Sequence, residues 1–95
     1  MAQRESRLSR QIISELEKQG IFAFKVHGGP YMMAGLPDVI ACVEGKFYGI
    51  ETKMPDGKNP TPIQLFVHEK IRKSGGEVYV ARSVKQALEK LGVES

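Results

Sequence analysis

The sequence predicts one α/β domain over residues 1–95, with a central mixed sheet flanked by helices. Three segments carry apolar residues at helical spacing, and four shorter runs are rich in the β-branched and aromatic residues of strands. Their order is helix, three strands, helix, strand, helix. Because the third and fourth strands are joined through a helix, we expect part of the sheet to be parallel.

Composition sets outer limits on function. A chain of 95 residues is long enough for one modest core, and its net charge of +3 is a mild indication of a polyanionic partner. The single Cys42 lies within an apolar run, which excludes an intramolecular disulfide and is typical of a reducing compartment. No stretch has the apolar length of a transmembrane helix and the N-terminus has no signal-peptide core. We therefore expect a cytosolic protein without membrane contact.

The first helix is predicted over residues 4–18 and ends at Gly20. Its apolar stripe, at four-residue spacing, is Leu8, Ile12 and Leu16. Glu5 continues the same stripe, which is unusual for an acid. It either favours the positive end of the helix dipole or points over the sheet as an additional acidic ligand.

The first strand, residues 21–26, is apolar on both faces apart from Lys25, so we expect helices to cover both of its sides. A glycine-rich loop follows over residues 27–35. Its amides are free to approach a phosphate, although most loops of this kind contact nothing. His27 is a candidate metal ligand or general base, but a lone histidine more often has a structural or solvent role.

Two apolar runs, residues 39–43 and 46–53, are separated by Glu44-Gly45, which is typical of a β-hairpin with a two-residue turn. That turn pairs Val43 with Lys46, Ile40 with Gly49, and Asp38 with Glu51. The alternative is a type I turn with a bulge at Gly45, which would shift the register by one residue.

Directly opposed residues on antiparallel strands have Cβ atoms roughly 4.5–5.5 Å apart, and like charges there destabilise the sheet. Asp38 and Glu51 therefore predict a divalent cation, because carboxylate oxygens suit Mg²⁺ or Mn²⁺. Without the cation, one of the two carboxyl groups should titrate upward. Lys53 lies two residues after Glu51 and faces the same side.

The second helix begins after a loop over residues 54–60. Thr61 is the predicted N-cap, Pro62 the first helical residue and Gln64 the capping-box partner. The predicted buried face consists of Ile63, Phe66, Val67 and Ile71. Ser74-Gly75-Gly76 ends this helix. A fourth strand over residues 77–81 and a last helix, capped by Ser83 and ended by Gly92, complete the chain.

These features resemble the PD-(D/E)XK nuclease superfamily, whose αβββαβ core is restriction-endonuclease-like. Within it the chain is most similar to VRR-NUC nucleases in their small stand-alone form, found in phage and bacterial genomes. The resemblance covers most of the chain. It is carried by Glu5, Gly35-Leu36-Pro37-Asp38, Glu51-Thr52-Lys53, and Thr61-Pro62-Ile63-Gln64. The resemblance depends on the placement of these motifs on adjacent strands, because each motif by itself is common in proteins.

The resemblance implies that Asp38 and Glu51 bind Mg²⁺, for which Mn²⁺ would substitute, with the Thr52 carbonyl as a further ligand. It also implies that Lys53 is the catalytic lysine and that Glu5 and Gln64 complete the site. For Gln64 a helix-capping role alone would look identical in the sequence, and we favour both roles. The implied reaction is metal-dependent phosphodiester hydrolysis in DNA, in a bacterial or phage-infected cytosol, with a charged Lys53 orienting the water.

Candidate nucleic-acid contacts are basic, aromatic or glycine residues outside the predicted core. They are Arg4, Arg7, Arg10, Lys25, His27, Gly28, Gly29, Tyr31, Lys46 and Lys58. Such charges are often only a solvated surface. A domain of this size has little surface for base readout, so we expect selection of DNA shape and, by resemblance, Holliday-junction resolution by a homodimer. Any protein partners are not indicated by the sequence.

Three alternatives stay open. The first is a flap or general structure-dependent endonuclease, or a monomeric nickase. The second is a catalytically inactive nucleic-acid-binding module. The third is a small α/β domain in which Asp38 and Glu51 merely flank loops, which two opposed carboxylates and a lysine argue against.

Overall fold

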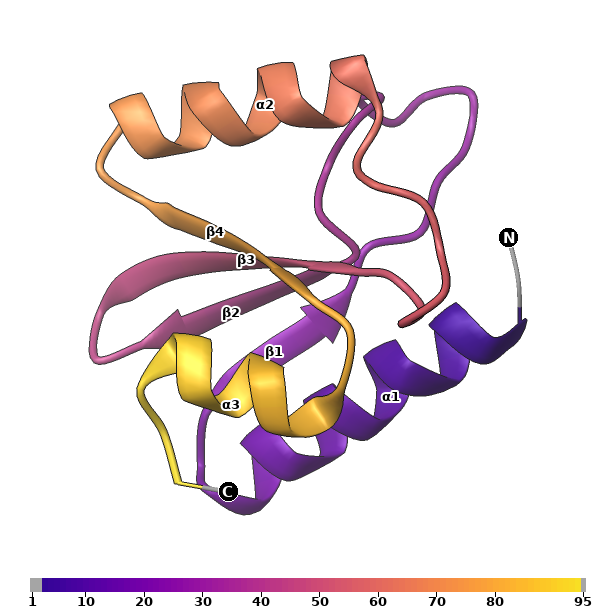
Figure 1. Ribbon diagram of the computed structural model, residues 1–95. Helices are drawn as coiled ribbons and strands as arrows, with labels where there is room; N and C mark the ends of the chain where they lie inside the picture. Colours follow the sequence, from indigo (N-terminus) through magenta and orange to yellow (C-terminus); the bar gives the residue numbers. More distant parts are fainter. Residues whose placement is uncertain (1–2, 95) are drawn as a thin grey trace.

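The computed structural model describes residues 3–94 and has the predicted order of elements (Figure 1). The elements are α1 (Gln3–Lys18), β1 (Phe22–Lys25), β2 (Val39–Val43), β3 (Lys46–Thr52), α2 (Pro62–Lys73), β4 (Glu77–Ala81) and α3 (Val84–Leu91). The predicted boundaries agree within a residue or two. Within residues 3–94, no helix is both long and apolar enough to cross a membrane.

The four strands form one mixed sheet in the order β1-β2-β3-β4. The first three strands are antiparallel neighbours, and β4 runs parallel to β3, as the intervening helix predicted. Glu44 and Gly45 have φ angles of 52° and 80°, so both turn residues are left-handed, as a two-residue type I′ turn requires. Ile40 pairs with Gly49 and Val43 with Lys46, which confirms the predicted register and rejects the bulge.

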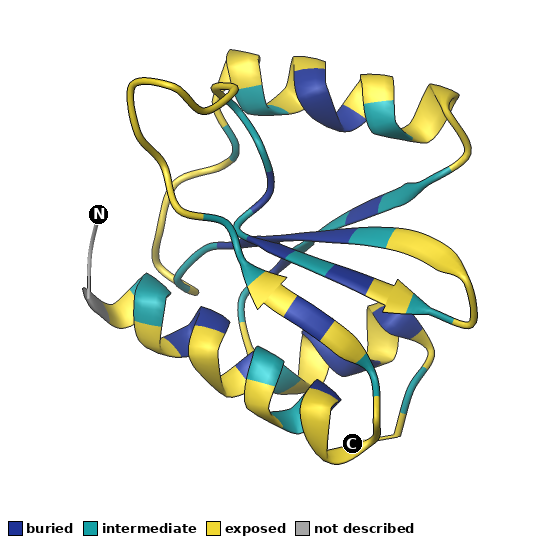
Figure 2. Ribbon diagram, turned by 180° about the vertical axis from the view of Figure 1, so that it is seen from behind, coloured by how far each residue is buried: buried dark blue, intermediate teal, exposed yellow. Residues whose placement is uncertain are grey.

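One face of the sheet is covered by α1 and α3, and the other by α2 (Figure 1). The main core lies on the α1 and α3 side, where Figure 2 shows the buried residues of both helices turned toward the sheet. The predicted stripe of Leu8, Ile12 and Leu16 is buried there against Val39 and Ile50. Burial of this apolar area is the main stabilising contribution to the fold.

The opposite face is only partly covered, which corrects the prediction that helices shield β1 on both sides. Phe22 and Phe24 are 69% and 45% exposed, and Phe47 is exposed beside them. Cys42 pairs with both Phe22 and Phe47 and is exposed too, although its apolar run predicted burial. The reason is that α2 is the one described helix on this face and packs toward β4.

The buried face of α2 also differs from its prediction. Val67 is buried and Ile71 is half-buried, but Ile63 and Phe66 are exposed, and the buried neighbour of Val67 is His68. With only one narrow side of α2 against the sheet, apolar residues on its flanks remain in solvent. The predicted Thr61 cap is present, with Gln64 as its capping-box partner.

Two glycines let the segment before β2 lie close to its neighbours. A Cβ at Gly49 would lie 2.7 Å from Pro37 Cγ, so Pro37 can rest on β3 only because position 49 has no side chain. Gly35 has a φ of 85°, and a Cβ there would lie 2.7 Å from the carbonyl oxygen of Ile63 in α2. Together these contacts fix the position of Asp38, which directly follows Pro37.

Candidate active site

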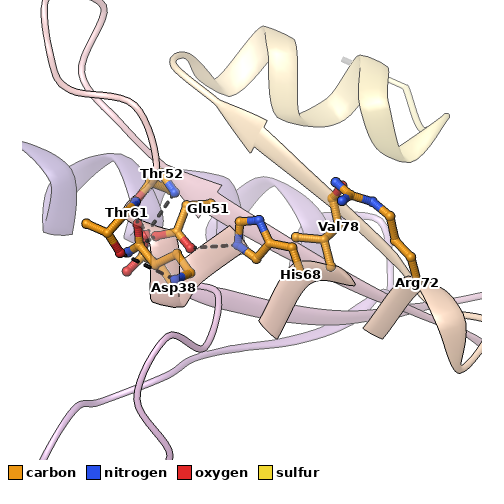
Figure 3. A network of polar contacts seen from close by, with 8 residues as sticks. Asp38, Glu51, Thr52, Thr61, His68, Arg72 and Val78 are labelled. Atoms are coloured by element: carbon orange, nitrogen blue, oxygen red, sulfur yellow. Dashed lines mark hydrogen bonds and ion pairs between the residues drawn. The ribbon is translucent and has the colours of Figure 1, made fainter. Parts of the chain in front are cut away.

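Asp38 is held by the residue that lies between Glu51 and Lys53 in sequence. The backbone nitrogen and the hydroxyl of Thr52 each donate a hydrogen bond to Asp38 Oδ2, both 2.9 Å long (Figure 3). Because the Thr52 hydroxyl gives its proton to Asp38, its 3.0 Å contact with Ser9 Oγ must have Ser9 as the donor. A chain of donors therefore runs from α1 through β3 to Asp38.

Glu51 is held from the other side of the sheet by α2. Its side chain is 1% exposed, and each carboxyl oxygen has one partner on the helix. Gln64 Nε2 donates to Oε2 at 3.0 Å, and His68 Nε2 lies 3.1 Å from Oε1. The Oε1 atom of Gln64 meanwhile accepts from the backbone nitrogen of Thr61 at 2.8 Å. The geometry thus joins both predicted interpretations of Gln64, since one amide group contacts Glu51 and completes the cap.

The electrostatics of the site favour a Glu51 carboxyl group that is either protonated or paired with a positive charge. Burial and, after it, the neighbouring Asp38 carboxylate raise the pKa of Glu51 to about 9, although the Lys53 ammonium acts in the opposite direction. This is the upward titration predicted for one carboxyl of the pair. Burial lowers the pKa of His68, and the nearby Arg72 guanidinium adds to that effect.

The chemistry of the donor set fits a hard divalent cation. Asp38 and Glu51 lie together at the end of β3 (Figure 3). Asp38 Oδ1 is not engaged by the two Thr52 bonds, and each Glu51 oxygen accepts one bond and keeps a second lone pair. A cation would offset the repulsion between the two carboxylates, which adds to the effect of burial on the pKa of Glu51. Among residues 3–94, no three carboxyl, imidazole or thiol groups are grouped closely enough to hold one ion.

Glu5 therefore does not form a three-carboxylate cluster with Asp38 and Glu51. It lies in the first turn of α1, half-buried, and its carboxylate contributes slightly to the raised pKa of Glu51. Both interpretations of Glu5 thus keep support, as a residue favouring the helix dipole and as a charge facing the site. Lys53 is half-buried beyond the end of β3, and its backbone nitrogen donates to the carbonyl of Ala81 at 3.1 Å.

The basic residues of α1 lie on its surface. Arg4, Arg7 and Arg10 are all exposed, and Arg4 makes a 3.5 Å ion pair with Asp56 in the loop after β3. Lys46 is less suitable than predicted as a contact at this site. It lies at the far end of β3 from Glu51 and pairs with Glu77 at 2.9 Å.

The glycine-rich loop forms a pocket that includes Asp38. The pocket has a volume of about 330 Å³, and its wall contains Gly28, Gly29 and the segment 32–38. A Cβ at Gly28 or Gly29 would meet nothing within 4 Å, so no contact inside the described chain requires glycine at either position. Asp38, a candidate metal ligand, lies in the wall of this pocket.

The remaining predicted contact residues are spread around this pocket and its neighbouring loops. His27 and Lys58 are exposed, and Tyr31 is 99% exposed at the tip of the loop. Lys25 is half-buried at the end of β1, where its Nζ donates to the carbonyl of Val26 at 3.1 Å. His27 is therefore not part of the carboxylate cluster, whereas the unpredicted His68 is.

Two site residues, Ser9 and His68, were not identified from the sequence. Both are almost fully buried; Ser9 contacts Thr52, and His68 contacts Glu51. Ser9 follows the apolar Leu8 and resembles an ordinary small helix residue. For His68 a signal was available, because it follows Gln64 by four residues and so shares its helical face.

The fold and site can be compared with proteins of known structure. A VRR_NUC domain matches with a TM-score of 0.74 and 29% identity, over 90% of this chain and 94% of that one. Hjc, described as a Holliday junction resolvase from the archaeal hyperthermophile Archaeoglobus fulgidus, matches with a TM-score of 0.63 and 28% identity, over 80% of this chain and 65% of that one. A VRR_NUC domain protein shares the fold at 18% identity, with a TM-score of 0.70 over 93% and 84% of the two chains.

No protein-family model matches the sequence, and no curated protein matches it. The structural likeness nevertheless extends over nearly the whole of both chains in the first comparison. It also agrees with the mixed four-stranded sheet, the helices on both faces and the C-terminal helix. The chain therefore has the VRR-NUC and resolvase-like nuclease fold that its sequence predicted.

Proposed function

We propose that this protein is a metal-dependent, structure-selective DNA endonuclease that resolves four-way junctions as a homodimer. The observation that carries the proposal is the pairing of Asp38 with the buried Glu51, next to Lys53, in a nuclease fold. Burial raises the pKa of Glu51, and repulsion from the Asp38 carboxylate adds to that effect. A divalent cation would remove that repulsion.

In the proposed mechanism, Asp38, Glu51 and the Thr52 carbonyl would hold Mg²⁺, for which Mn²⁺ would substitute. Such a cation would supply positive charge next to the phosphate and the leaving oxygen. The Lys53 ammonium orients the attacking water and stabilises charge on the phosphoryl oxygens. Thr52 and Gln64 keep the two carboxylates in place, and Glu5 adds negative charge at the edge of the site.

DNA as the substrate is supported by the similarity to Hjc, a Holliday junction resolvase, and by the charge of the chain, +3 overall. The exposed arginines of α1, with Lys25, His27, Tyr31 and Lys58, would contact the phosphodiester backbone, which positions DNA without reading its sequence. The Gly28-Gly29 segment, in the wall of the Asp38 pocket, would accept a phosphate beside the carboxylates. These contacts favour selection by DNA shape.

The homodimer is supported by apolar surface on the face that carries α2. Phe22 and Phe24 on β1 and Phe47 on β3 are exposed, with β2 between these two strands. Beside them, a groove of about 450 Å³ between α2 and β3 is lined mainly by apolar residues, among them Met33, Leu36 and Val67. Contiguous exposed apolar surface marks interaction sites in soluble proteins. A twofold dimer would cover this surface and present two sites to the symmetric strands of a junction.

The substrate proposal is tested with end-labelled four-way junction, flap, single-stranded and duplex DNA, incubated in parallel with Mg²⁺, Mn²⁺ or EDTA. Paired, symmetric incisions in the junction support the resolvase. Single cuts confined to flaps or splayed arms would keep the nuclease and replace junction resolution with a flap endonuclease or nickase.

The inactive binding module is separated from the enzyme by Asp38→Asn. If the protein is an enzyme, this variant binds junction DNA as the wild type does and no longer cleaves it. If the wild type binds DNA and cleaves none of the four substrates with either cation, the binding module replaces the enzyme.

A further inference from the structure

Three polar side chains follow one line along the sheet-facing side of α2. Gln64, His68 and Arg72 are four residues apart, so they lie one above another on the helix. Each reaches the sheet: Gln64 and His68 contact Glu51, and Arg72 donates to the carbonyl of Val78 at 2.9 Å. Figure 3 shows His68 between Glu51 and Arg72. This line gives α2 a polar contact with β3 and β4 on a face where little apolar area is buried.

His68 is the most buried member of this line. Its side chain is 2% exposed, and a buried imidazole without a hydrogen bond would destabilise the fold. The contact that satisfies it is the 3.1 Å pair of its Nε2 with Glu51 Oε1. The position on α2 therefore places an imidazole where its polar atom meets a proposed metal ligand.

The two α2 contacts act on different oxygens of the same carboxyl group. Rotation about the last torsion of a glutamate is soft, so packing of the stem alone does not fix the plane of its oxygens. One hydrogen bond leaves that plane free to turn about the bonded oxygen. The bond from Gln64 Nε2 to Oε2 and the contact of His68 Nε2 with Oε1 together remove this freedom.

We propose that His68 is a positioning residue, whose Nε2–H holds the plane of the Glu51 carboxylate so that its remaining lone pairs face Asp38. The inference rests on the proposed metal-dependent function and deepens it. It assigns α2 a second contact with the metal site besides Gln64. Partners of ligating carboxylates typically contribute 10-fold to 100-fold to metal affinity or activity.

The direct test is calorimetric titration of the DNA-free protein with Mn²⁺. His68→Leu removes the donor at similar volume, and His68→Gln keeps an N–H at a similar distance from the backbone. We expect the Mn²⁺ dissociation constant to rise about 10-fold in His68→Leu and to return to within about 3-fold of wild type in His68→Gln. An unchanged constant in His68→Leu, or no restoration in a folded His68→Gln, would overturn the proposal.

DNA cleavage gives a second readout. If Glu51 is misaligned, the protein should need more Mg²⁺ for the same rate of cleavage. The Mg²⁺ concentration for half-maximal junction cleavage should rise about 10-fold in His68→Leu, while the rate at saturating Mg²⁺ changes much less. A merely structural role would lower thermal stability and leave this concentration unchanged.

A measurement that leaves His68 in place keeps the proposal testable if His68→Leu does not fold. The chain contains two histidines, so His27→Gln leaves one imidazole whose ring ¹⁵N signals belong to His68. We expect the Nε2–H tautomer and a change of its shift on adding Mg²⁺. The Nδ1–H tautomer, or no change at saturating Mg²⁺, would overturn the inference.

Glu51→Gln separates failure of the inference from failure of the proposed function. If wild type and Glu51→Gln bind Mn²⁺ equally, or neither binds it, the metal site itself is wrong and the inference fails with it. If Mn²⁺ binding depends on Glu51 but not on His68, the inference alone is wrong.

Discussion

Thr52 donates two hydrogen bonds to a single oxygen of Asp38, one from its backbone nitrogen and one from its hydroxyl, each 2.9 Å long. This pairing explains why the middle residue of the Glu-Thr-Lys segment is a buried threonine. Its backbone and side chain together fix Asp38 against β3. The hydroxyl also receives a hydrogen bond from Ser9, so α1 takes part in placing the carboxylate.

Thr52→Val should weaken cation binding at the site without changing the shape of the site. The substitution keeps the backbone bond to Asp38 but removes the hydroxyl bond, so Asp38 is less firmly oriented. We expect about a 10-fold rise in the Mg²⁺ concentration for half-maximal cleavage. Stability should fall by about 1–2 kcal/mol, because the buried hydroxyl of Ser9 loses its acceptor. Cleavage across a Mg²⁺ series and urea unfolding measure the two effects.

The matched control is Ser9→Ala combined with Thr52→Val. The double variant no longer buries an orphaned hydroxyl, so it should regain stability relative to Thr52→Val alone. Its cation requirement should stay high because Asp38 still lacks the Thr52 hydroxyl. An unaltered Mg²⁺ requirement in both variants would show that the hydroxyl does not orient Asp38.

The raised pKa of Glu51 makes the stability of the cation-free protein depend on pH. With a folded pKa of about 9 against an ordinary value of 4.5, the folded state keeps a proton that the unfolded state releases. This contribution is complete below pH 4.5 and is lost as pH rises toward 9. We expect the free energy of unfolding to fall between pH 7 and 9, by at most about 1.4 kcal/mol per pH unit.

Glu51→Gln is the control for this pH dependence. The amide does not titrate, so the variant should lose less stability over the same pH interval. His68 does not complicate the comparison, because its lowered pKa places its titration below pH 7. Parallel stability profiles of wild type and Glu51→Gln, measured by urea unfolding in EDTA, would contradict the assignment.

The two roles of Gln64 can be separated with Thr61. Thr61→Ala removes the bond from the backbone nitrogen of residue 64 to the Thr61 hydroxyl and leaves the Gln64 contact with Glu51. Gln64→Ala keeps that backbone bond and removes both the bond from Thr61 N to Gln64 Oε1 and the Glu51 contact. Loss of one half of the capping box should lower stability by about 1 kcal/mol in each variant. Only Gln64→Ala should also reduce Mg²⁺-dependent cleavage. Equal cleavage by the two variants would reduce Gln64 to a capping residue.

The exposed aromatic face predicts a substitution that separates dimerisation from folding. Phe22 is 69% exposed, so Phe22→Glu should leave the monomer folded but place charge in the proposed interface. We expect sedimentation to shift from dimer to monomer and paired junction incisions to become single nicks. Gln11→Glu, on the exposed side of α1, adds the same charge elsewhere and should change neither. A monomeric wild type would rule out the homodimer.

The features that were predicted correctly depend on residues that are close together in the sequence. The Glu44-Gly45 pair specifies a two-residue turn, and that turn fixes the register of β2 and β3. The register in turn brings Asp38 and Glu51 to the same end of the hairpin. The N-cap at Thr61 and the glycines after each helix likewise depend on only a few neighbouring residues.

The incorrect predictions concern which residues are covered on each face of the sheet. A strand that is apolar on both sides predicts helices on both sides, but β1 lies at the sheet edge beyond the reach of α2, so Phe22 and Phe24 are exposed. His68 was missed because its burial depends on the distant Glu51. Cys42 is exposed because no described helix covers the outward face of its apolar run.

The central claim is most directly tested by single-turnover cleavage of a four-way DNA junction by wild type, Asp38→Asn and Glu51→Gln, in Mg²⁺ and in EDTA, with junction binding measured in parallel. We predict paired incisions only by the wild type in Mg²⁺, with binding retained in both variants. Cleavage that persists in EDTA or in either variant would contradict catalysis at this pair of carboxylates.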